Sequence, residues 1–153
     1  MSKPYRKCVG MMILNNKNEI LVGKRIDHPS GFWQMPQGGI DEKENPEEAV
    51  WREMIEEIGT NKAELIKVSN QWISYDIPHE TLKTLPWGHK YKGQIQKWFA
   101  FQFLGDDNDI NVGTKNPEFS EWKWTKIESI IDEIVPFKRN VYSTILEEFK
   151  DIF

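Results

Sequence analysis

Residues 38–60 contain acidic side chains whose types and spacing suit the binding of a divalent cation. Glu53, Glu56 and Glu57 follow one another closely in a segment with a helical pattern. At about 100° per residue, the three carboxylates lie within an arc of roughly 100° on one side of such a helix. Such like charges repel, and Arg52 is the helix's single basic residue. A solvated outer face is one interpretation. The other is a site for Mg²⁺ or Mn²⁺, which carboxylate oxygens bind well.

The residues around this acidic run are suited to positioning it. A turn at Gly38 and Gly39 exposes backbone groups beside the helix, where a carbonyl can join a metal site. Arg52 is expected to pair with Glu44 and so to hold the preceding loop against the helix. Gly59 is placed to end the helix.

The helix is predicted over residues 45–58. Asn45 is a favourable N-cap and Pro46 suits the first helical position. The apolar side chains opposite the carboxylates are expected to face the core: Trp51, Met54, Ile55 and Ile58.

Strands are predicted on both sides of this helix, and a second helix closes the chain. A turn rich in Asn indicates that the first two strands form a hairpin. The remaining segment, residues 78–93, resembles a polar loop. This order predicts an α+β domain with helices packed on a mixed sheet. The predicted strands are residues 7–14, 19–26, 31–36, 63–77, 94–104 and 121–127, and the closing helix is residues 137–153.

Composition narrows the class of protein. The 153 residues suffice for one domain with a core. No apolar run reaches membrane-spanning length, and residues 1–10 lack the apolar stretch of a signal peptide, so we expect none. Cys8 is the only cysteine, so no internal disulfide is expected. It lies among apolar residues, and we therefore expect it in the core. The net charge of −4 argues against bulk electrostatic binding of nucleic acid, but it allows local cations to hold an anionic substrate. We expect a cytoplasmic monomer with no DNA or membrane partner.

Residues 38–60 resemble the signature of the Nudix hydrolases, G-x5-E-x7-R-E-U-x-E-E-x-G-U, where U is a bulky apolar residue. Only Thr60 departs from it, at a packing position. The resemblance implies a single Nudix domain over residues 6–149, with the Nudix box at 38–59, and an α/β/α sandwich with a mixed sheet flanked by helices. The matching residues are Gly38, Glu44, Arg52, Glu53, Met54, Glu56, Glu57 and Gly59.

The family hydrolyses a diphosphate linkage in a nucleoside diphosphate joined to another group, with the help of divalent cations. The resemblance implies that Glu53 is the general base and that Glu57 and Arg52 belong with it to the catalytic set. The base varies in this family and can come from a loop. Glu118, otherwise a solvated loop acid, matches a glutamate that reaches the metals. The implied ligands of Mg²⁺, or of Mn²⁺, are Gly38 through its carbonyl, Glu53, Glu56, Glu57 and Glu118.

Stretches outside the box resemble the branch of RNA pyrophosphohydrolases and dinucleoside polyphosphate hydrolases: WQMPQGGI, QKWF, PEF, WKW and FKRNVY. The implied reaction removes pyrophosphate from 5′-triphosphorylated RNA and leaves a 5′-monophosphate, which promotes mRNA decay. The alternative substrate is a diadenosine polyphosphate, such as the tetra- or pentaphosphate. A module that binds nucleotide or RNA without hydrolysis is a further alternative, but it would be expected to lack a box glutamate.

The same resemblance implies a set of substrate-binding residues. Arg25, Lys138 and Arg6 would contact phosphates, although each alone resembles a surface cation. Phe137 would stack on the terminal base with Arg25 on the other side, although its place before an apolar helix also suits a core residue. The pocket would be completed by Gln37 and Tyr75.

Residues 79–92 are cationic and include Trp87 and Tyr91. Two interpretations remain for this segment. It is either a solvated loop or a surface that an RNA strand follows beyond its first nucleotide.

Overall fold

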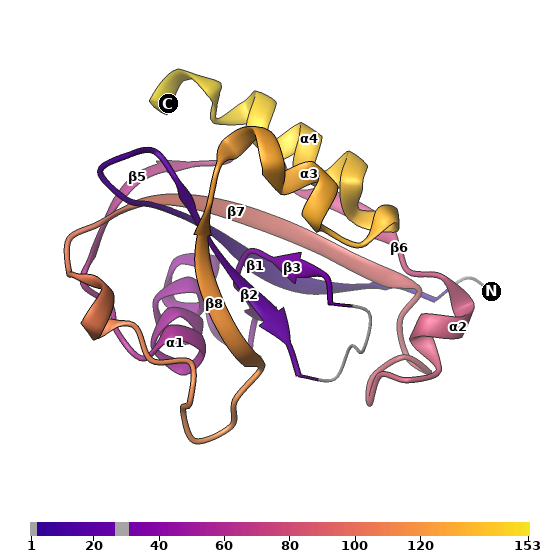
Figure 1. Cartoon of the computed structure of the whole chain (residues 1–153). Helices are drawn as coiled ribbons and strands as arrows, with labels where there is room; N and C mark the ends of the chain where they lie inside the picture. The colour runs from indigo at the N-terminus through magenta and orange to yellow at the C-terminus, as the bar shows by residue number, and fades with distance from the viewer. Residues whose placement is uncertain (1–2, 27–30) are drawn as a thin grey trace.

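The long strand β1 organises a mixed sheet that separates two layers of helices. A computed structural model describes residues 3–26 and 31–153. Figure 1 shows α3 and α4 above the sheet and α1 below it. The strands are β1 (Tyr5–Leu14), β2 (Ile20–Arg25), β3 (Trp33–Gln34), β4 (Gln37–Gly39), β5 (Ala63–Val68), β6 (Ile73–Asp76), β7 (Gly93–Phe103) and β8 (Phe119–Thr125). The α-helices are α1 (Pro46–Ile58), α2 (His79–Leu82), α3 (Ile130–Glu133) and α4 (Arg139–Glu148).

β1 is buried from Cys8 to Leu14, which is typical of a strand covered on both faces. It pairs in parallel with β7 from Tyr5↔Gly93 to Leu14↔Gln102, and it pairs antiparallel with β4. β5 and β6 extend the sheet beyond β7, while β3 and β8 pair with β2. The sheet is therefore mixed, as the sequence predicts.

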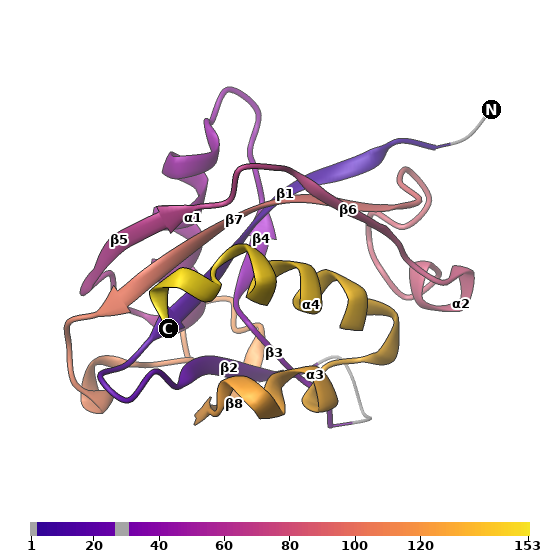
Figure 2. The same ribbon diagram turned by 90° about the horizontal axis from the view of Figure 1, so that it is seen from above.

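Each face of the sheet carries its own core. On the α1 face, Val50, Met54 and Ile58 pack against side chains of β1 and β7. On the other face, Tyr142 and Ile145 of α4 pack against a second set from the same strands. Seen from above in Figure 2, α4 lies across the sheet. These two cores confirm the predicted α+β class and the α/β/α sandwich.

The predicted hairpin is confirmed only at its turn. β1 and β2 pair at Leu14↔Ile20 and then take different partners, β7 and β4 for the first and β8 and β3 for the second. A central apolar strand needs a neighbour on each edge, and partners distant in sequence supply them here.

Other predicted bounds change in detail. The strand expected at residues 63–77 divides into β5 and β6, and the one expected at 31–36 is limited to β3. The loop expected at 78–93 begins with the short helix α2. The helix expected at 137–153 consists of α4 between two 3₁₀ turns, Pro136–Lys138 and Lys150–Ile152.

α1 begins and ends as predicted. The Asn45 side chain caps α1 by accepting the Glu48 N–H, and the Glu48 carboxylate accepts the Asn45 N–H. The expected division of its faces is partly wrong, because Ile55 is 48% exposed whereas Glu57 is 4% exposed. α1 is turned about its axis so that Glu57 faces β4.

None of the helices within residues 3–26 and 31–153 combines the length and the apolar character that a membrane span requires.

Gly59 gives a test of how α1 ends. Its φ is 76°, and a Cβ added there would lie 2.8 Å from the Asn111 carbonyl oxygen. Left-handed strain alone costs about 1–2 kcal/mol. We expect Gly59→Ala to lower the free energy of unfolding by more than this, because the Asn111 contact adds to the strain. Gly31→Ala is the matched control, since Gly31 has φ 77° but its nearest neighbour, Lys24, is 3.7 Å away. Equal losses in denaturant unfolding would show that the Asn111 contact is unimportant.

Candidate functional site

β4 lies directly against α1. The turn expected at Gly38 and Gly39 is not observed, because both residues lie within β4 and pair with β1. A Cβ added to Gly38 would lie 2.0 Å from Cδ of Glu53, so a side chain at this position would displace the carboxyl group. Gly38 pairs with Val9 of β1, which fixes β4 to the centre of the sheet. The absence of a side chain at Gly38 therefore lets a carboxylate and a backbone strand meet.

Arg52 joins β4 and the loop that follows it to α1. Its Nε and Nη2 donate to the two carboxylate oxygens of Glu44, each at 2.8 Å, which confirms the expected pair. Nη2 also donates to the Gly39 carbonyl at 2.8 Å. The guanidinium lowers the pKa of the Glu44 carboxyl to about 2, so Glu44 stays ionised at neutral pH.

The same guanidinium reaches the acidic helix. Arg52 Nη1 donates to Glu53 Oε1 at 2.9 Å and to Glu56 Oε2 at 3.1 Å. Arg52 thus partly offsets the repulsion between these carboxylates. Its planar fork of donors suits several acceptors at once, which a lysine cannot match.

Glu53 and Glu57 are carboxyl groups held in poorly solvated surroundings. The Glu53 side chain is 12% exposed, and burial raises its pKa to about 7 against the opposing effect of Arg52. Burial also raises the pKa of Glu57 well above its usual range, and the charges of Glu53 and Glu118 add to this effect. Glu57 Oε2 accepts the Gln37 N–H at 3.2 Å.

The donor set fits a hard divalent cation, because several carboxylates lie close enough to raise one another's pKa. In the described part of the chain, no three His, Cys, Asp or Glu side chains are grouped so that they could hold a metal ion as they stand. The carboxylate oxygens of Glu53 and Glu56 are turned toward Arg52 instead. Residues that would hold the cation are therefore near one another without forming a finished coordination shell.

Glu118 lies just before β8 and next to Arg25 at the end of β2. Arg25 Nη2 is 3.7 Å from Glu118 Oε2, and the Ile26 N–H donates to the Glu118 carbonyl. Glu118 raises the pKa of Glu57 while Arg25 lowers it. Both side chains therefore belong to the electrostatic surroundings of the acidic helix, although they come from other strands.

A second group of predicted residues lies beside this acidic site. The rings of Tyr75 and Phe137 are 6.3 Å apart, and Lys138 Nζ lies 5.7 Å from the Tyr75 ring centroid. Lys138 is buried, with Nζ 3.5 Å from Gln34 Oε1. Phe137 is half-buried, so part of its surface stays accessible for stacking.

Arg6 lies over Gly39, the last residue of β4. Its guanidinium is 4.9 Å from the Trp87 ring centroid, and a Cβ added to Gly39 would lie 2.3 Å from its Nη2. Cys8, which Arg6 Nη1 approaches to 3.7 Å, is fully buried as predicted. Burial raises the pKa of the Cys8 thiol to about 11, so it is uncharged at neutral pH.

Two buried glutamines were missed by sequence reasoning. Gln94 Oε1 accepts bonds from Tyr75, Gln37 and Gln96 at 2.9, 3.3 and 2.9 Å. Gln96 donates to Gln37 Oε1 at 2.8 Å and accepts from Trp98 Nε1 at 2.9 Å. Polar residues at alternate positions of an otherwise apolar strand were the available signal. The network fixes Gln37, whose N–H holds Glu57.

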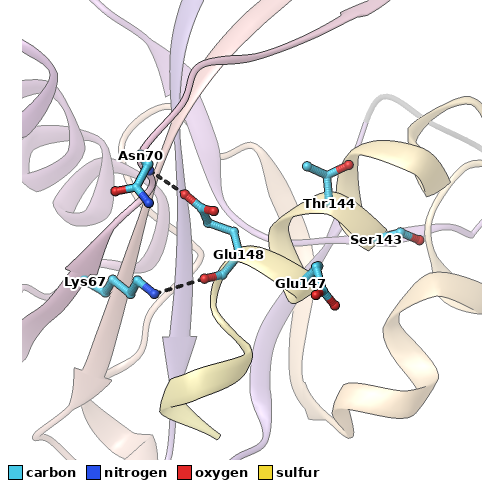
Figure 3. A pocket seen from close by; sticks show the side chains of 6 residues that line it. All are labelled: Lys67, Asn70, Ser143, Thr144, Glu147 and Glu148. Atoms are coloured by element: carbon cyan, nitrogen blue, oxygen red, sulfur yellow. Dashed lines mark hydrogen bonds between the residues drawn. The ribbon is translucent and has the colours of Figure 1, made fainter.

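A separate depression of about 550 Å³ lies between α4 and the segment joining β5 to β6 (Figure 3). Some of its lining residues are held by hydrogen bonds that involve the backbone. Lys67 Nζ donates to the Glu148 carbonyl at 3.0 Å and to Asp151, and the Asn70 N–H donates to the Glu148 carboxylate. None of the predicted site residues lines this depression. Its lining residues are Lys67, Asn70, Ser143, Thr144, Glu147 and Glu148.

Comparison with known proteins places the site in context. A NUDIX domain is matched over residues 4–145. A Rhodospirillum rubrum protein named RNA pyrophosphohydrolase is 50% identical over 145 residues, covering 95% of this chain and 87% of that protein. A Rickettsia typhi protein of the same name is 49% identical over 149 residues, covering 97% and 92%. The MutT protein of Methanosarcina mazei shares the fold, with a TM-score of 0.72 at 21% identity and coverage of 97% of each chain.

The raised pKa of Glu53 gives a test in metal-free buffer. The folded chain holds this proton more tightly than the unfolded chain, so the stability contributed by Glu53 is full below about pH 4.5 and is lost as pH rises through about 7. We expect Glu53→Gln to remove this part of the pH dependence of the free energy of unfolding. Glu47→Gln, which changes an exposed carboxylate on the first turn of the same helix, is the control. An unchanged profile in Glu53→Gln would contradict the description of the site.

Proposed function

The chain belongs to the Nudix hydrolase family, and from this membership we propose that it removes pyrophosphate from 5′-triphosphorylated RNA and leaves a 5′-monophosphate. The supporting observation is the near-50% identity to proteins named RNA pyrophosphohydrolase, which extends over almost the whole chain. In the cell, the product end would promote mRNA decay. We further propose that the chain acts in the cytoplasm as a monomer and has no DNA partner.

Members of the family generally use divalent cations, and we assign Mg²⁺ here, with Mn²⁺ as a substitute. When bound, such a cation neutralises phosphate oxygens and acidifies a water molecule. The residues that would hold it are Gly38 through its carbonyl, Glu53, Glu56, Glu57 and Glu118. Their oxygen donors suit these hard ions, and the mutual repulsion of the carboxylates is what a cation would relieve.

Glu53 is the proposed general base, which accepts the proton of the attacking water. Its carboxyl group lies against Gly38 and accepts from Arg52, which fixes its position in the site. Arg52 is proposed to act through position, since it donates to Glu53, Glu44 and the Gly39 carbonyl. Glu57 completes the proposed set, held by the Gln37 N–H.

The substrate is proposed to lie over the end of β4, between the acidic helix and the aromatic pair Tyr75 and Phe137. Phe137 would stack on a base, the interaction commonly used for unpaired RNA ends. Phosphates would contact the basic side chains of Arg25, Lys138 and Arg6. Gln37 would line the pocket.

A diadenosine polyphosphate is the alternative substrate, since it presents the same nucleoside polyphosphate chemistry to the same residues. A binding module without hydrolysis is disfavoured, because Glu53, Glu56 and Glu57 are all present.

The test compares kcat/KM with Mg²⁺ for a short 5′-triphosphorylated RNA and for diadenosine tetraphosphate, with EDTA replacing Mg²⁺ as the background. We expect the RNA to be the better substrate and to yield pyrophosphate with a 5′-monophosphate end. A higher kcat/KM for the dinucleotide would favour the alternative, and hydrolysis of neither would reject both activities.

We expect Glu57→Gln to lower kcat/KM by more than about a hundredfold, since changes even to residues behind a metal ligand cost about 10–100-fold. The fold should survive, because the substitution keeps the side-chain volume and replaces a buried carboxyl group, whose pKa burial raises, with a neutral amide. Glu47→Gln is the matched control on the exposed first turn of the same helix. Near-normal turnover by Glu57→Gln would reject its metal role.

A further inference from the structure

Residues 79–92, here called the cationic loop, form a positively charged surface on an acidic chain. Lys83 pairs with Glu80 at 3.4 Å. His89 and Lys90 are exposed, and neither is within ion-pair distance of an acidic side chain in the described residues. The basic residues of the loop are His79, Lys83, His89, Lys90 and Lys92.

The cationic loop has a defined shape. Leu82, Leu85 and Trp87 pack against the core on the α4 face of the sheet. At its end, the Lys92 N–H donates to the Pro4 carbonyl at 3.0 Å, and the Ile77 N–H donates to the Lys92 carbonyl at 3.0 Å. A surface that is ordered in advance loses less conformational entropy when it binds a ligand.

The loop is continuous with the proposed active site. The Arg6 guanidinium lies between the Trp87 ring, at 4.9 Å, and Gly39 at the end of β4. Trp87 and Tyr91 contact edge to face, with centroids 5.9 Å apart. The loop also follows shortly after β6, the strand that carries Tyr75. Figure 2 shows α2 at the end of the sheet where β1 and β7 begin.

Aromatic rings beside lysines are the combination that binds single-stranded nucleic acid without sequence preference, through base stacking and phosphate contacts. We propose that the cationic loop binds the nucleotides that follow the first one or two of a single-stranded RNA, with Tyr91 meeting a base and Lys90 meeting phosphates. This proposal rests on the proposed function, because it extends the binding site of the same substrate.

The length of the RNA gives the test. We expect kcat/KM to be higher for a ten-nucleotide 5′-triphosphorylated RNA than for a two-nucleotide one, because only the longer strand reaches the loop. Lys90→Glu should lower the ratio of the two values by about fivefold. It should also reduce the slope of log kcat/KM against log salt for the decamer by about 0.7, the value for one phosphate contact on a single strand.

Lys17→Glu is the matched charge control, since Lys17 is exposed in the β1–β2 turn, and it should keep the wild-type ratio. Tyr91→Ala should lower the ratio at least about fivefold through lost stacking, and thermal unfolding checks that it folds. Lys90 is exposed, so its substitution does not disturb the core.

Two results separate failure of this proposal from failure of the proposed function. If the wild-type chain releases pyrophosphate from both RNAs but Lys90→Glu matches Lys17→Glu, the loop has no role in binding and the activity stands. If neither RNA is hydrolysed, fluorescence anisotropy in EDTA still compares their affinities. Tighter binding of the decamer, weakened by Lys90→Glu, would support the loop site, whereas equal affinity would overturn it.

Discussion

One guanidinium, that of Arg52, holds β4, the loop that follows it and the acidic helix together. It binds both carboxylate oxygens of Glu44, the Gly39 carbonyl and an oxygen each of Glu53 and Glu56. Without the positive charge of Arg52, carboxylates at these spacings would repel one another on the helix. The strong pairing with Glu44 also fixes the side chain of Arg52, so that the remaining acids have a defined partner before any divalent ion binds.

The sandwich places this assembly against a rigid backbone. β1 is held by β4 on one edge and by β7 on the other, and both helical layers pack on it. Gly38 brings β4 against Glu53, while the glutamine network beside β4 connects Gln37 to Tyr75. The residues proposed to handle the metal and those proposed to handle the nucleoside are thereby linked through a single short strand.

Local chemistry made much of this predictable. The Asn45 cap, the Gly59 terminus and the pairing of Arg52 with Glu44 depend on residues close in sequence, so the sequence alone indicated them. The burial of Glu57 and the exposure of Ile55 depend on how α1 is turned against the sheet, which helical periodicity does not specify. The parallel pairing of β1 with β7 was equally out of reach, because partners about ninety residues apart leave no local signal.

The position of the bound cation tests the central claim most directly. A crystal structure of the chain soaked with Mn²⁺, with the ion located by its anomalous signal, would show which residues hold it. We expect the ion beside Gly38 with carboxylate oxygens of Glu53 and Glu57 as ligands, and Arg52 still paired with Glu44. An ion bound away from α1, or bound there only after the Arg52–Glu44 pair has broken, would contradict the role given to this guanidinium.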